Sequence, residues 1–92
     1  MTKEAYKEKI KKNQSSTTEH EHFLMLINDD VHSFEYVIDA LISICNHTEQ
    51  QAVQCTTITH YKGKCDVKKG NFNELRKMRK ALIEKELKAQ IN

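Results

Sequence analysis

The chain has 92 residues, enough for one small domain and too few for two. Fifteen basic and thirteen acidic residues give a formal net charge of +2, which is too small for a dedicated nucleic-acid-binding protein. No apolar run reaches the roughly 18 residues that a membrane span needs. Three cysteines cannot all pair within one chain and no secretion signal opens the sequence, so we expect reduced thiols and a cytoplasmic protein.

The first part of the chain is polar and charged. An unbroken polar run extends from Asn13 to Thr18, and apolar residues become frequent only from Phe23 onward. Such a composition cannot bury enough apolar surface to fold by itself. The sequence therefore predicts a flexible N-terminal extension over residues 1–22 and a folded domain over residues 23–92.

A strand and a helix open the folded domain. The short apolar run Phe23–Ile27 ends at three turn-forming residues, Asn28–Asp30, and this pattern predicts a buried strand. From Phe34 to Cys45, apolar residues recur at three- and four-residue steps, which predicts an amphipathic helix. Asp30 or Ser33 can cap the start of this helix.

The next segment carries conflicting signals. Thr48 and Gln51 have the spacing of a capping box, which predicts the start of a second helix. The β-branched run Thr56–Thr59 and the turn-like segment Tyr61–Lys64 favour a hairpin that leads into a strand at Cys65–Val67. Local propensity alone leaves helix and hairpin open.

A third helix and a closing strand complete the chain. Asn71 and Glu74 have the spacing of a helix cap. Apolar residues at helical spacing follow them: Leu75, Met78, Leu82 and Ile83. The segment from Leu87 to Ile91 then alternates apolar and polar residues, as a strand does. With a helix in the disputed segment, the element order is β-α-α-β-α-β.

One group of polar residues suits the binding of a cationic amine. Asn28 to Asp30 supply an amide and two carboxylates at the end of a strand, and His60 follows downstream. An amine needs several acceptors around one nitrogen, and these side chains offer them. Asn and Asp also favour turns and helix caps, so a purely structural role stays open.

Other chemistry has weaker support. The side chains that could hold zinc do not have the spacing of a usual zinc module, so we expect neither a metal nor another cofactor. These residues are Cys45, His47, Cys55, His60 and Cys65. No nucleophile elbow or phosphate loop is present, and we expect no enzyme. Residues 76–88 are rich in Lys and Arg, typical of a solvated helix face or of a docking surface for an acidic partner.

Two motifs together resemble the ClpS family of adaptors, which deliver N-degron substrates to a Clp AAA+ unfoldase and its protease. The first runs from Leu26 through Asn28-Asp29-Asp30 to Ile38, and the second is His60-Tyr61-x-Gly63-Lys64. The resemblance covers residues 23–91 and favours a helix at Thr56–Thr59. It implies an α+β fold, a two-layer α/β sandwich in which three helices pack on a three-stranded antiparallel sheet.

The resemblance also implies roles for individual residues. The substrate's free α-amino group would be held by Asn28, Asp29, Asp30 and His60. The pocket for its bulky hydrophobic side chain, of the Leu, Phe, Tyr or Trp class, would be lined by His32, Ser33, Phe34, Val37, Thr56, Thr59 and Ala89. Docking on the unfoldase's N-terminal domain would use Glu74 and Arg79.

The partners implied by the resemblance are a Clp unfoldase of the ClpA or ClpC type and N-degron substrate proteins. We expect the adaptor to be a monomer that binds neither nucleic acid nor a membrane. An alternative is a docking module of the ribosomal-stalk type, which would use the basic face of the third helix instead. This sequence also departs from the family. Most members carry larger apolar residues at the positions of Thr56 and Thr59, so we expect a wider or wetter pocket here.

Overall fold

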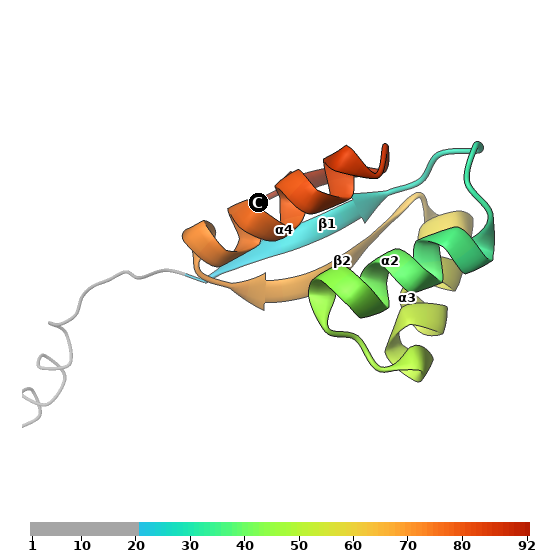
Figure 1. The fold of residues 1–92 in the computed structure, drawn as a ribbon, viewed down its shortest axis with the longest axis horizontal. Coiled ribbons are helices and arrows are strands. Elements are labelled where there is room, and N and C mark those ends of the chain that lie inside the picture. The colour runs from blue at the N-terminus through green and yellow to red at the C-terminus, as the bar shows by residue number, and fades with distance from the viewer. Residues whose placement is uncertain (1–20) are drawn as a thin grey trace, which may run out of the picture.

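The fold was obtained as a computed structural model, which describes residues 21–92. The elements follow one another as β1 (His22–Ile27), α2 (Phe34–Cys45), α3 (Glu49–Lys62), β2 (Lys64–Gly70), α4 (Phe72–Glu84) and β3 (Lys88–Ile91) (Figure 1). This order confirms the predicted β-α-α-β-α-β arrangement. The extension predicted over residues 1–22 lies outside the described residues except for its last two, and His22 already belongs to β1. No helix in the described range is both long enough and apolar enough to cross a membrane.

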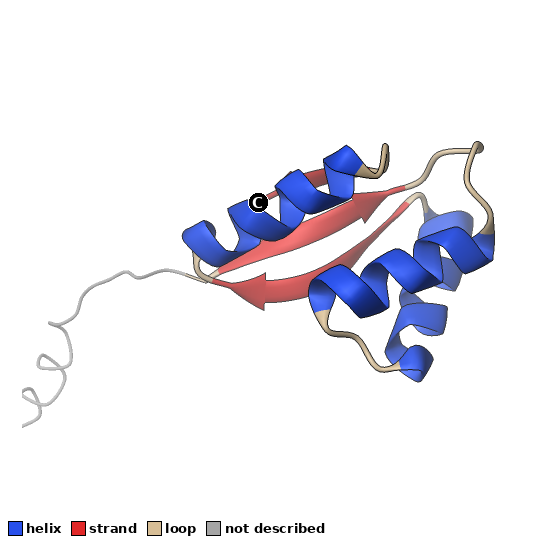
Figure 2. Cartoon of the chain, viewed as in Figure 1, coloured by secondary structure: helices blue, strands red, loops and turns tan. Residues whose placement is uncertain are grey.

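The three strands form an antiparallel sheet in the order β2-β1-β3. The first strand in sequence is therefore the central one, with β2 and β3 on its two sides (Figure 2). Leu26 pairs with Cys65 on β2 and with Ala89 on β3. The register of β1 and β2 shifts by one residue after Leu24, which is the mark of a β-bulge.

The core lies between the sheet and the helices. Leu24 and Leu26 alternate along β1 and are almost fully buried, as expected for the face of a strand that the helices cover. The other apolar side chains of the core come from every helix and from both other strands: Ala40, Leu41, Cys45, Ala52, Val67, Leu75, Leu82, Leu87 and Ala89. Burial of these side chains is the main force that holds the layers together.

Each helix begins at a capping side chain. The Ser33 hydroxyl accepts a hydrogen bond from the Tyr36 backbone N–H at 3.1 Å, so Ser33, and not Asp30, caps α2. Thr48 and Gln51 form the predicted capping box at α3. Asn71 caps α4 by accepting from the backbone N–H of Glu74 at 2.9 Å. These caps satisfy N–H groups that would otherwise have no partner at a helix start.

The disputed segment is helical. α3 continues through Thr56–Thr59 and ends at Gly63, whose φ of 93° is the left-handed conformation that glycine adopts most readily. Local propensity does not decide between helix and hairpin here, because the buried face of α3 carries Thr56 and Thr59 beside Ala52. That face lines a pocket as well as the core, so it lacks a continuous apolar stripe.

Candidate functional site

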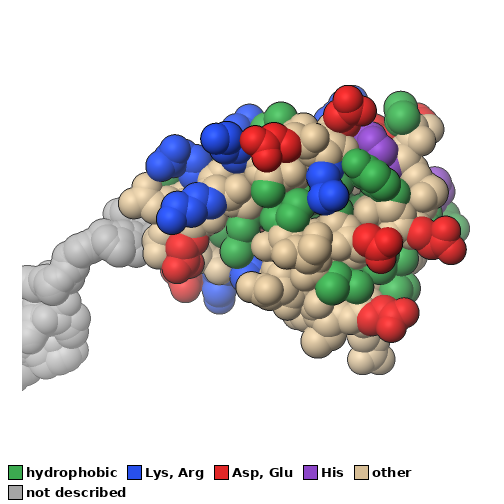
Figure 3. Space-filling model, in the orientation of Figure 1, with side chains coloured by type: hydrophobic (Ala, Val, Ile, Leu, Met, Phe, Trp, Pro, Cys, Tyr) green, Lys and Arg blue, Asp and Glu red, His purple; other side chains and the backbone are tan. Residues whose placement is uncertain are grey.

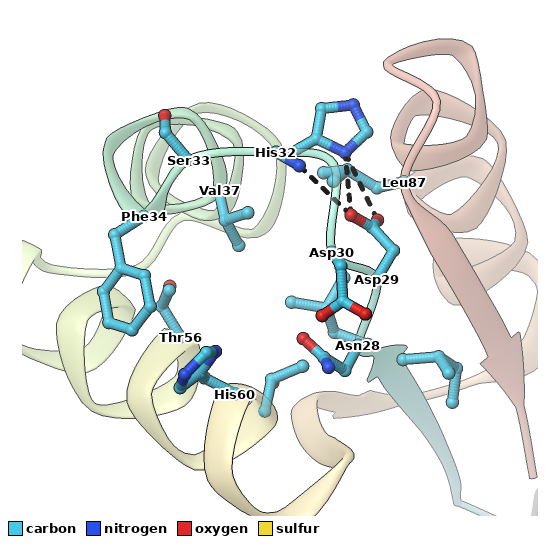
Figure 4. A pocket seen from close by; sticks show the side chains of 13 residues that line it. Asn28, Asp29, Asp30, His32, Ser33, Phe34, Val37, Thr56, His60 and Leu87 are labelled. Atoms are coloured by element: carbon cyan, nitrogen blue, oxygen red, sulfur yellow. Dashed lines mark hydrogen bonds and ion pairs between the residues drawn. The ribbon is translucent and has the colours of Figure 1, made fainter.

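One pocket of about 220 Å³ opens where the end of β1 meets α2 and α3. Its polar part is formed by the residues that follow β1 and by the last turns of α3, and its apolar part by Val37, Phe34 and Leu87 (Figure 4). The residues that line it are Leu26, Ile27, Asn28, Asp29, Asp30, His32, Ser33, Phe34, Val37, Thr56, Thr59, His60 and Leu87. A hollow with an apolar wall and a few polar groups at one side is the usual form of a small-ligand site.

A backbone hydrogen bond fixes the two sides of this site against each other. The N–H of Asn28, the first residue after β1, donates to the carbonyl oxygen of Gly63 at 2.9 Å. Gly63 in turn closes α3 through its own N–H, which donates to the carbonyl oxygen of Thr59 at 2.9 Å. The end of β1 and the last turn of α3 are therefore held side by side, which brings Asn28 and His60 to the same pocket.

Three polar side chains around the pocket form no hydrogen bond with another group in residues 21–92. They are the side chains of Asn28, Asp30 and His60. In Figure 4, Asn28 and Asp30 extend from the strand end toward the cavity, and His60 faces them from α3. Together they offer an amide oxygen, a carboxylate and an imidazole nitrogen to a group bound between them.

Unlike Asn28 and Asp30, Asp29 has a side chain that is hydrogen-bonded within its own loop. Its carboxylate accepts from the backbone N–H groups of Val31 at 2.9 Å and His32 at 3.2 Å, and it contacts the His32 ring nitrogen Nδ1 at 3.2 Å. The side chain of Asp29 therefore points toward the loop and away from the cavity (Figure 4). Predicted as an amine ligand, Asp29 instead shapes the loop from which Asp30 projects.

The bonds around Asp29 predict a pH-dependent stability. Burial alone would raise the pKa of Asp29, but the N–H groups of Val31 and His32 and the His32 ring outweigh burial and hold the pKa below 3.8. A carboxyl with a lowered pKa in the folded state stabilises the fold above its unfolded pKa, and this contribution is lost as the pH falls through the folded pKa. We expect Asp29→Asn to be less stable than wild type above the ordinary pKa of an aspartate, with the gap closing as the pH falls through the lowered pKa of the folded state.

Urea unfolding of both proteins over that pH range measures this gap. A constant difference in the free energy of unfolding would show that the charge of Asp29 does not stabilise the loop.

Aromatic rings border the pocket. The rings of Phe34 and His60 meet edge to face with their centroids 5.3 Å apart, and Tyr61 packs against His60 at 4.8 Å. His32 stacks on Tyr36 at 4.7 Å on the other side of the loop. Phe34 is the first residue of α2 and is 42% exposed, so its ring forms part of the rim and is not locked in the core.

The comparisons with known proteins agree with this fold. No curated protein sequence matches the chain. The model of one family, described as ATP-dependent Clp protease adaptor protein ClpS, matches residues 17–90. The chain belongs to the ClpS family. ClpS proteins are adaptors of a protease and not proteases themselves.

A solved ClpS protein has the same fold. The structure of Agrobacterium tumefaciens ClpS2 bound to L-phenylalaninamide superposes with a TM-score of 0.72 and 22% sequence identity, over 78% of this chain and 94% of that one. This match confirms the ClpS-like arrangement of three helices on a three-stranded antiparallel sheet.

Most residues that the ClpS resemblance implies for the site lie at this pocket, and one on β3 does not. Every residue expected to hold the amine or to line the side-chain pocket does line this pocket, except Ala89. Ala89 is buried in the core opposite Leu26, and Leu87, two residues earlier, lines the pocket instead. Sequence reasoning missed Leu26, Ile27 and Leu87, which it read only as apolar strand residues.

The two residues expected to dock on the unfoldase both lie on α4. Glu74 is exposed in its first turn, and Arg79 is exposed but donates from Nε to the carbonyl oxygen of Ala89 at 3.0 Å. Five residues of helix place their side chains about 140° apart around the axis. They therefore do not form one pair on one face. Figure 3 shows Lys and Arg side chains gathered over α4, where Arg76, Lys77 and Lys80 are exposed.

The five Cys and His side chains with zinc-binding chemistry do not all gather at one place. Cys45 lies in the core, where burial raises the pKa of its thiol to about 11. His47 is buried and donates from Nε2 to the carbonyl oxygen of Val67 at 2.6 Å. Cys55 and Cys65 lie together at the carbonyl oxygen of Asp66, and His60 faces the pocket. Among residues 21–92, no group of three or more His, Cys, Asp or Glu side chains is placed to hold a metal ion.

Proposed function

We propose that this ClpS-family chain binds the free N-terminal residue of N-degron substrates and delivers them to a Clp AAA+ unfoldase. The observation that carries the proposal is the convergence of Asn28, Asp30 and His60, with unengaged polar atoms, on one side of a pocket with an apolar wall. A ligand with a cationic amine next to a bulky apolar side chain matches both parts.

The amine chemistry follows from counting donors and acceptors. An α-ammonium group has three N–H donors and carries a positive charge over most of its population at pH 7, since its ordinary pKa is about 7.7–8.0. The Asn28 amide oxygen, the Asp30 carboxylate and a ring nitrogen of His60 supply three acceptors, one of them charged. Acetylation of the substrate removes both the charge and two of the donors, so it should abolish binding.

The side chain of the same residue would occupy the rest of the pocket. Val37, Phe34 and Leu87 supply apolar surface, and Thr56 and Thr59 line the same space with smaller side chains that each carry a hydroxyl. L-phenylalaninamide, the ligand of the ClpS2 structure, combines a free α-amine with an aromatic side chain. A first residue of the Leu, Phe, Tyr or Trp class is the corresponding ligand for this chain.

Delivery would need a second surface, away from the pocket. α4 is the candidate for it, because Glu74 and Arg79 are exposed on different sides of this helix and the basic residues Arg76, Lys77 and Lys80 are exposed on it as well. The unfoldase would be of the ClpA or ClpC type, and a monomeric adaptor carries both surfaces. Since an adaptor must release what it delivers, we expect a small interface of less than about 1,200 Å².

Fluorescence anisotropy of a labelled peptide that begins with Phe, beside its N-acetylated twin, tests the proposal. We expect the free-amine peptide to bind and the acetylated peptide not to bind at the same concentrations. Equal binding of both would show that the pocket does not recognise an amine. If peptides led by Leu, Phe, Tyr and Trp all fail to bind, the proposal is wrong, and docking through the basic face of α4 becomes the better hypothesis.

A further inference from the structure

Within residues 21–92, one buried hydroxyl at the pocket has no hydrogen-bond partner. Among the described residues, the buried polar side-chain atoms without a hydrogen bond are Nδ1 of His47 and Oγ1 of Thr56. The His47 ring is bonded through its other nitrogen to the carbonyl oxygen of Val67. Thr56 is only 4% exposed and has a single polar atom in its side chain, so its whole hydrogen-bonding capacity is unused.

Two neighbouring threonines on α3 avoid this situation. The hydroxyl of Thr57 donates to the carbonyl oxygen of Val53 at 2.8 Å, and that of Thr59 donates to the carbonyl oxygen of Cys55 at 2.7 Å. Both use the usual bond from a helical threonine to the carbonyl four residues earlier. Thr56 makes no such bond. A valine at this position would have the same shape and would leave no buried polar atom without a hydrogen bond.

The position of Thr56 connects it to the proposed substrate. Thr56 and His60 both line the pocket, and they lie four residues, or about 6 Å of helix rise, apart on α3. In Figure 4, Thr56 and Phe34 lie at the end of the cavity opposite Asn28 and Asp30. A side chain that extends from an amine held at Asn28 would therefore point toward Thr56. The Phe34 ring, which is 42% exposed, would have to turn aside to admit it.

We propose that Thr56 recognises a hydroxyl group on the first side chain of the substrate, so that the pocket prefers N-terminal Tyr to N-terminal Phe. The inference rests on the proposed function and adds a selectivity to it. Tyr is Phe with a hydroxyl at the far end of the ring, and that hydroxyl can both donate to and accept from Thr56. Phe and Leu leave the buried Thr56 hydroxyl unpaired, and a site with an unpaired buried polar group rejects the ligand that lacks its partner.

The test compares two peptides that differ only at the first residue, Tyr or Phe, on wild type and on Thr56→Val. We expect wild type to bind the Tyr-led peptide about tenfold more tightly, as one added hydrogen bond to a buried hydroxyl implies. In Thr56→Val the ratio should fall to about one, through weaker binding of Tyr and not through tighter binding of Phe alone. Thr57→Val is the matched control, because it removes a hydroxyl of the same helix that is already bonded to the Val53 carbonyl and does not line the pocket, and it should keep the wild-type ratio.

Each other outcome overturns the inference. Equal affinities for Tyr and Phe in wild type, or an unchanged ratio in Thr56→Val, would overturn the role of Thr56 while leaving amine recognition intact. Failure of every free-amine peptide to bind would overturn the proposed function as well. Thermal unfolding of the free proteins is a further check, and we expect Thr56→Val to melt at or above the wild-type temperature. A clearly lower melting temperature would mean that the hydroxyl has a partner inside the free protein.

Discussion

Replacing Asp30 with alanine is expected to weaken the binding of a free-amine peptide by about 10- to 100-fold. Asp30 supplies a charged acceptor that faces the cavity, and a hydrogen bond to a charged group contributes about 1.5–3 kcal/mol where water is partly excluded. Adding Asn28→Ala should remove binding altogether at micromolar concentrations. Anisotropy or calorimetric titration with the same Phe-led peptide measures both steps.

Asp39→Ala is the matched control for this experiment. Asp39 is an exposed carboxylate on α2 that does not line the pocket, so its removal changes the net charge by the same amount without touching the site. We expect it to keep affinity within about twofold of wild type, as expected for a screened surface charge. Equal losses in the two variants would mean that Asp30 acts only through long-range attraction. An Asp30→Ala protein that binds as tightly as wild type would remove Asp30 from the amine site.

Leu82→Ala is expected to lower the free energy of unfolding by about 2–5 kcal/mol, the usual range when a leucine is truncated inside a core. Leu82 lies on α4 with 0% exposure, in the core beneath the sheet. Its neighbour Ile83, on the same helix, is 43% exposed, and Ile83→Ala should cost less than about 1 kcal/mol. Urea denaturation of the two variants and wild type gives both values. Similar losses in the two variants would mean that α4 does not pack through Leu82.

Much of the fold follows from patterns that are local in the sequence. The caps at Thr48 and Asn71 and the alternation along β3 were enough to place elements to within a residue or two. The exception was the threonine segment of α3, where local propensity divided evenly. In the folded protein this segment is helical, and Ala52, Thr56 and Thr59 are buried on one face of it. The packing of the rest of the domain against that face selects the helix, whereas the local propensity of the threonines does not.

The site depended on long-range information that periodicity does not contain. Nothing local shows that Asn28 and His60 line one pocket, since that arrangement depends on the hydrogen bond between Asn28 and Gly63 and on the pairing of β1 with β2. The family resemblance was what indicated that Asn28 and His60 belong to one site. It did not distinguish Asp29 from Asp30, because only the loop geometry shows which carboxylate faces inward. It also chose Ala89 where the longer Leu87 reaches the pocket.

The order β2-β1-β3 has a consequence for how the domain is made. The central strand is translated first, yet its last partner, β3, is translated at the end of the domain. While the ribosome is still adding α4, one edge of the apolar β1 strand has no partner, and such an edge invites pairing with other chains. We infer that the sheet closes only after synthesis has passed Ile91. A chain that stops within α4 would then be a candidate for degradation, the fate to which this family of adaptors commits other proteins.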